Sequence, residues 1–139
     1  MTERETIDYI NIEILHTSLV IACLNKSERL NDELNKKKNS DIKEYIQKEL
    51  GRDLEEFKDS CARTTFNVDS GKPILVFIRN DKRDWNFFQT IVHEVNHVVE
   101  GFAYYCGFED EQEFKAYLSG YLFAEIRKML HNQNKKKRK

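Results

Sequence analysis

Residues 90–100 read Thr-Ile-Val-His-Glu-Val-Asn-His-Val-Val-Glu and contain the pattern HExxH, with His93, Glu94 and His97 at its fixed positions. On an α-helix these two histidines lie one turn apart on the same face, with the carboxylate beside them. The stretch therefore predicts a helix over residues 84–106 that offers two imidazoles to a metal ion such as zinc.

The expected helix divides into a polar stripe and an apolar face. At about 100° per residue, Glu100 and Tyr104 fall within about 20° of His93. The opposite side is expected to pack against the core, so that the histidines line a half-buried site. This expected core face consists of Trp85, Phe88, Ile91, Val92, Val95, Val98, Val99, Phe102 and Ala103.

Length and charge indicate one domain without a general affinity for polyanions. The chain has 139 residues and a formal net charge of −1, so neither nucleic acid nor an anionic membrane attracts it as a whole. Residues 1–131 are expected to form a single domain. Residues 132–139, which end in Lys-Lys-Lys-Arg-Lys, are expected to be a disordered, solvated basic tail rather than a specific nucleic-acid contact.

The cysteines and the N-terminal residues indicate in which cellular compartment the protein is expected. Cys23, Cys61 and Cys106 are odd in number, far apart and form no CxxC pair, which argues against a disulfide framework and a thiolate zinc cluster. The charged N-terminus leads into no signal-peptide pattern, and the apolar run 19–24 is too short to span a bilayer. We expect a soluble cytoplasmic protein that makes no membrane contact.

The first half of the chain predicts a hairpin followed by charged helices. Residues 7–15 alternate apolar and polar side chains, a turn follows at 16–18, and residues 19–24 form a short apolar run. Helices are expected from Ser27 to about Lys37 and from Asp41 to Leu50, with further turns within residues 53–60. Gly51 stands where a left-handed helix cap is common.

A second hairpin leads directly into the HExxH helix. Residues 62–68 alternate, residues 69–72 have turn composition, and residues 73–78 form a continuous apolar strand that begins with proline. After Gly107 a last helix is expected from Glu111 to about His131. The predicted fold class is therefore α+β, with the metal site between the last two helices.

A zinc hydrolase needs a third protein ligand and an open position for water. The extended pattern HExxHxxGxxH is excluded because residues 100 and 103 are Glu and Ala. Cys61 lies in a context unlike that of a deformylase cysteine ligand. A carboxylate on the following helix remains the best candidate.

Glu113 is the preferred third ligand. It shares a helix face with Ala116, Gly120 and Ala124, and small residues at this spacing allow two helices to approach closely. Glu100 is the rival, but three ligands on one straight helix would span about 10 Å of rise, more than bonds of about 2 Å gather easily. Glu100 therefore suits a place beside the ligands.

These motifs carry a resemblance to a known family. The HExxH segment, the short connection and the segment 113–122, Glu-Phe-Lys-Ala-Tyr-Leu-Ser-Gly-Tyr-Leu, resemble the small zincin metallopeptidases of phages and mobile elements. The pattern is similar to that of gluzincins and, more distantly, to the ImmA/IrrE group. The resemblance covers residues 62–128 and implies a small zincin-like domain that binds Zn²⁺ and hydrolyses peptides or proteins.

The implied mechanism assigns His93, His97 and Glu113 to the metal and Glu94 to general base catalysis by accepting the proton of the attacking water. A substrate peptide is expected to add along the strand 74–78, provided that this strand is a sheet edge.

Three phenols are candidates for stabilising the oxyanion, and the sequence does not choose among Tyr104, Tyr117 and Tyr121. The alternative function is a zincin-fold module that binds a partner protein without cleaving it. An intact Glu94 favours the enzyme, because a purely structural metal site has no use for a general base.

Overall fold

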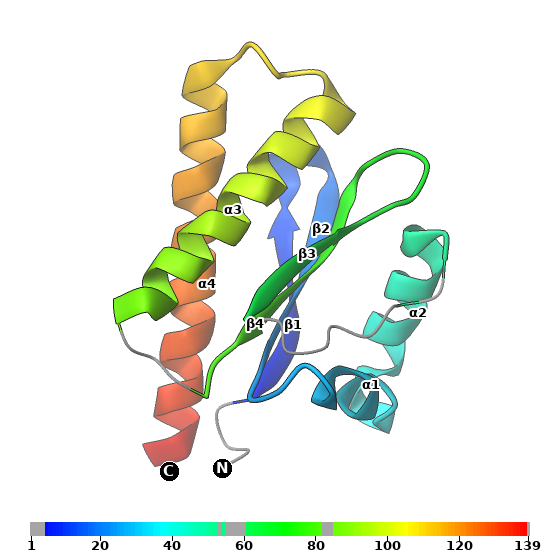
Figure 1. Ribbon diagram of the computed structural model, residues 1–139, viewed down its shortest axis with the longest axis vertical. Coiled ribbons are helices and arrows are strands. Elements are labelled where there is room, and N and C mark those ends of the chain that lie inside the picture. Colours follow the sequence, from blue (N-terminus) through cyan, green and yellow to red (C-terminus); the bar gives the residue numbers. More distant parts are fainter. Residues whose placement is uncertain (1–4, 53, 55–60, 82–84, 139) are drawn as a thin grey trace.

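The computed structural model describes residues 5–52, 54, 61–81 and 85–138. Its fold is α+β, as expected, and is built on one mixed sheet with helices on both faces (Figure 1). The strands are β1 (Thr6–Ile12), β2 (Thr17–Leu24), β3 (Ala62–Phe66) and β4 (Pro73–Arg79).

Both expected hairpins are present. β1 pairs antiparallel with β2 across a short 3-10 helix at Glu13–Leu15, and β3 pairs antiparallel with β4. The two hairpins join through a parallel pairing of β2 with β4, so the strand order is β1-β2-β4-β3. Each of the two central strands carries a continuous apolar run, because both faces of the sheet pack against an apolar core.

The position of β4 corrects one expectation. The segment 74–78 lies inside β4, which is hydrogen-bonded to β2 on one side and to β3 on the other. It therefore has no free edge to which a peptide could add. Within the part of the chain that the structure describes, β3 has a strand neighbour on one side only and forms one edge of the sheet, while β1 forms the other.

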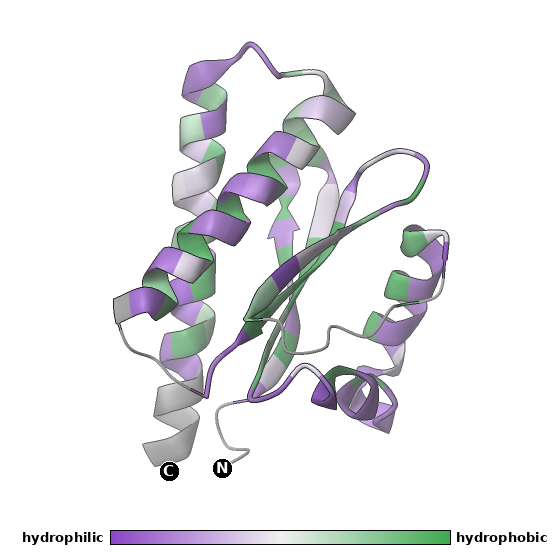
Figure 2. Ribbon diagram, viewed as in Figure 1, coloured by the Kyte–Doolittle hydropathy of each residue, from purple (hydrophilic) through white to green (hydrophobic). Residues whose placement is uncertain are grey.

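The helices form two layers around the sheet. α1 (Arg29–Leu34) and α2 (Ser40–Leu50) cover one face, and α3 (Trp85–Cys106) and α4 (Gln112–Arg138) cover the other (Figure 1). α2 buries Ile42, Ile46 and Leu50 and turns its polar side outward (Figure 2). Each face of the sheet thus has its own apolar core.

The helix bounds differ in part from those expected. α1 is shorter than the segment 27–37, and α4 continues to Arg138, beyond the expected end near residue 131. α2 ends at Leu50 as expected, and Gly51 caps it in the left-handed conformation with a φ of 77°. Apart from Leu54, the turns expected within residues 53–60 lie outside the described residues. None of the described helices is both long enough and apolar enough to cross a membrane.

The buried face of α3 is rotated relative to the expected one. Phe88 and Val92, expected in the core, are 48% and 46% exposed, whereas Phe87 is buried. Ile91, Val95, Val98, Val99, Phe102 and Ala103 are buried as expected. The reason is that α3 packs against β3 and β4 as well as crossing α4 obliquely, which draws the side carrying Phe87 and Glu94 inward (Figure 1).

A glycine sets the distance between α3 and the second hairpin. A Cβ atom on Gly101 would lie 2.7 Å from the Pro73 ring and 2.8 Å from the Phe66 ring, closer than carbon atoms approach without displacement. Gly120, in the middle of α4, has nothing within 4 Å of the same position. The two helical glycines therefore differ only in what surrounds them.

This difference predicts opposite effects of the same substitution. Gly101→Ala should lower the free energy of unfolding by about 1–3 kcal/mol, because the added methyl group overpacks the contact. Gly120→Ala should raise it by about 0.5–1 kcal/mol, because alanine is the better helix former. Urea denaturation of both variants measures this, and equal effects would contradict the close contact at Gly101.

Candidate metal centre

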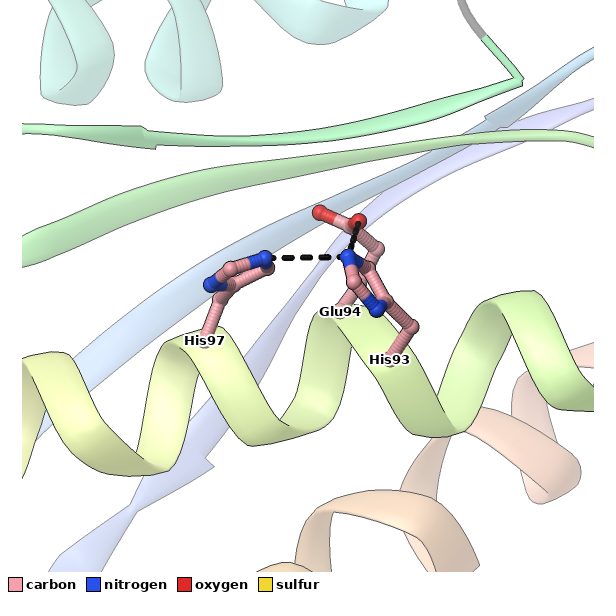
Figure 3. Close-up of side chains that lie close together, drawn as sticks. All are labelled: His93, Glu94 and His97. Atoms are coloured by element: carbon pink, nitrogen blue, oxygen red, sulfur yellow. Dashed lines mark hydrogen bonds and ion pairs between the residues drawn. The ribbon is translucent and has the colours of Figure 1, made fainter.

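The two histidines converge on one point beside α3. The Nε2 atoms of His93 and His97 lie 3.0 Å apart, and their rings stand nearly perpendicular, with centroids 4.6 Å apart (Figure 3). Among the described residues, His93, Glu94 and His97 form the one group of potential metal ligands whose ligand atoms all lie within 4.8 Å of one another. The helical spacing of the sequence therefore places these three side chains as expected.

The distance between the imidazole nitrogens fits a shared zinc ion. Two nitrogens that each bind tetrahedral zinc at about 2.0–2.1 Å lie about 3.3 Å apart, close to the 3.0 Å in the structure. The same distance also suits a hydrogen bond between one protonated and one unprotonated nitrogen. The His93 side chain is 68% exposed, so the site is more open than the half-buried one expected.

Glu94 differs from the histidines in that it is buried. Its side chain is only 7% exposed, and its Oε1 accepts a hydrogen bond of 2.7 Å from the Thr64 hydroxyl on β3. Its Oε2 lies 4.0 Å from Nε2 of His93, too far for a hydrogen bond. One carboxylate oxygen is thus fixed by the edge strand while the other faces the imidazoles.

The role of Thr64 is not evident from the sequence. The alternating pattern of residues 62–68 assigns Thr64 and Phe66 to the same face of the strand, and that face does meet α3. The partner of Thr64 could not be found in this way, because it depends on which strand lies beneath the helix.

Glu113 does not join the group. It is exposed in the first turn of α4, and the structure does not bring it together with the imidazoles. The expectation that Ala116, Gly120 and Ala124 face a neighbouring helix is wrong, because all three are exposed. α4 packs instead through Leu118, Leu122, Ile126 and Leu130.

Glu100, the rival ligand, has a different partner. It follows His97 by less than one turn, yet its 65% exposed side chain accepts a hydrogen bond of 3.1 Å from Nζ of Lys115 on α4. The Lys115 side chain is only 15% exposed, so this ion pair links the two helices beside the metal centre. Glu100 is therefore engaged with α4 rather than with the imidazoles.

The three candidate tyrosines occupy different places. The Tyr121 hydroxyl donates a hydrogen bond of 2.6 Å to the carbonyl oxygen of Asn11 on β1, so it is engaged away from the histidines. Tyr117 on α4 is 62% exposed, and Tyr104 on α3 is 69% exposed.

Comparisons of the chain with models of protein families, with curated proteins and with solved structures found no significant match. The arrangement of the residues around His93 and His97 is therefore the basis for any functional conclusion.

Metal analysis tests the centre directly. Protein purified without added zinc and then dialysed against a zinc solution should bind about one equivalent of zinc. The variants His93→Ala and His97→Ala should each fail to bind zinc, because one imidazole alone holds the ion weakly. Lys128, whose ammonium pairs with Glu125 on the outer part of α4, offers a control position: Lys128→Ala should bind as wild type does. Equal binding by all four proteins would contradict the site.

Proposed function

We propose that this chain is a zinc-dependent peptide hydrolase in which His93 and His97 hold the metal and Glu94 is the general base. The observation that carries the proposal is the buried Glu94 carboxylate, which the Thr64 hydroxyl fixes beside two converging imidazoles. A carboxylate is costly to bury, so its retention next to an open ligand pair is better explained by chemistry than by packing. The zincin resemblance of the sequence supports the same conclusion.

The chemistry divides between the metal and the carboxylate. Zinc held by the two imidazoles would supply a Lewis acid that makes water a nucleophile near neutral pH. Glu94 would accept the proton of the attacking water through the oxygen that Thr64 does not engage. It would then deliver this proton to the amine that leaves when the peptide bond breaks.

The third ligand remains part of the proposal. We retain Glu113 for this role on the strength of the resemblance, which places a glutamate on the helix after HExxH. Because Glu113 is exposed and α4 approaches α3 through other side chains, its binding would require the first turn of α4 to move toward the histidines.

The proposed substrate is a peptide or a protein segment in extended form. Such a segment would add to β3, which, unlike β4, is an edge strand among the described strands and which contacts α3. β3 also carries Thr64, so the strand that would pair with the substrate is the one that fixes the base. A cytoplasmic location, expected from the cysteine pattern and the N-terminus, belongs to the proposal as well.

A protein-binding module without proteolytic activity is the second candidate. It is favoured by the placement of Glu113 outside the group of His93, Glu94 and His97, because a catalytic zinc site normally has three protein ligands. The two functions differ in their dependence on Glu94, which only the hydrolase requires.

Replacing Glu94 distinguishes the hydrolase from the binding module. Glu94→Gln should bind zinc as wild type does and should cleave a peptide library at least about 100-fold more slowly, because the amide cannot accept the proton. Mass spectrometry of the products and metal analysis of the same samples measure both effects. Wild-type protein that binds zinc and cleaves no member of the library would support the binding module.

The role of Thr64 has a matched control one residue away. Thr64→Val removes the hydrogen bond to Glu94 and should slow cleavage by about 10- to 100-fold, while Thr64→Ser should restore it. Thr65 is buried on the opposite face of β3, and its hydroxyl has no partner among the described residues, so Thr65→Val should leave cleavage unchanged. Equal losses in both valine variants would indicate a structural effect of the strand alone.

A further inference from the structure

Tyr104 is the most exposed of the large apolar and aromatic side chains in the described part of the chain. It is 69% exposed, although it lies on α3, a helix that otherwise forms much of the core. Its ring lies beside Gly71 in the loop between β3 and β4, where a Cβ atom would stand 3.8 Å from the ring. The glycine thus leaves this side of the ring uncovered by a side chain.

Tyr104 lies on the same stripe of α3 as the histidines. It follows His97 by seven residues, which is almost two full turns and about 10.5 Å of helix rise. An extended peptide covers this distance in about three residues. A side chain that contacts Tyr104 would therefore belong to a residue about three positions from the bond held at the histidines.

The edge strand β3 runs alongside α3 from the histidines toward Tyr104. Thr64 on β3 contacts Glu94, and Phe66, two residues further along the strand, lies against Gly101. β3 and α3 therefore proceed in the same direction on this side of the molecule, from the metal centre toward Tyr104. A peptide paired with the outer edge of β3 would pass from one to the other.

The surroundings favour an apolar side chain over a basic one. A tyrosine ring can receive either, and an unpaired acid nearby would favour a cation. Glu100 lies on the stripe between His97 and Tyr104, but Lys115 neutralises it. The ring is left as an exposed aromatic surface beside a glycine, against which an apolar side chain can pack.

We propose that Tyr104 forms a subsite for a large apolar side chain of the substrate peptide, about three residues from the cleaved bond. This inference rests on the proposed peptide hydrolase function. It assigns a preference for Leu, Met, Phe or Tyr at one position of the substrate. Peptides paired antiparallel with β3 would carry this side chain on the amino-terminal side of the bond.

Adjacent tyrosines supply the control for the test. Tyr105 is 46% exposed, but it lies about 100° around the helix from Tyr104, and its ring receives Nζ of Lys72 at 5.9 Å from the centroid. Tyr104→Ala and Tyr105→Ala remove the same number of atoms from neighbouring exposed positions. A general effect on α3 would therefore appear in both.

The experiment profiles the cleavage sites of the zinc-loaded full chain in a mixed peptide library. Wild-type protein should prefer a large apolar residue about three positions from the cleaved bond by about tenfold over alanine, Tyr104→Ala should abolish this preference, and Tyr105→Ala should keep it. Cleavage without the preference, or a preference that survives Tyr104→Ala, would overturn the subsite and leave the hydrolase intact. Zinc-loaded wild type that cleaves nothing would overturn the hydrolase and the subsite with it.

Discussion

The hydrogen bond between Thr64 and Glu94 is the contact on which the geometry of the site depends. A carboxylate that leaves water must find a donor, and the Thr64 hydroxyl supplies it across the interface between helix and sheet. The apolar side chains that α3 buries set its rotation, and the hydrogen bond agrees with that rotation. Once Glu94 faces β3, the helical spacing directs His93 and His97 outward.

The local elements could be read from the sequence, but the order of the strands could not. Alternating side chains and turn residues identified both hairpins, because these signals lie within a few residues of one another. Which hairpin strand meets which depends on the parallel pairing of β2 with β4, which joins segments far apart in the chain. The continuous apolar run of residues 73–78 reflects a strand buried on both faces, whereas its two strand neighbours are set by pairings that the run itself does not specify.

In the candidate site too, the local part could be predicted from the sequence and the long-range part could not. His93, Glu94 and His97 lie within five residues, so the geometry of one helix brings them together. The position of Glu113 depends on how α4 crosses α3, and two patterns on α4 competed for that interface. Small residues at 116, 120 and 124 suggested close packing, whereas Leu118, Leu122 and Ile126 offered more apolar surface to bury, and the leucine side is the one that packs.

Gly101 connects a position without reactive groups to the chemistry of the site. It stands seven residues after Glu94 on nearly the same side of α3, and its missing side chain lets this end of the helix rest on Phe66 and Pro73. α3 is thus held at two points: its C-terminal part packs on Phe66 and Pro73, and the Glu94 carboxylate nearer its middle is hydrogen-bonded to Thr64. A larger residue at position 101 would push this end of α3 away from Phe66 and Pro73, so the packing at Gly101 and the hydrogen bond between Thr64 and Glu94 are linked through the same helix.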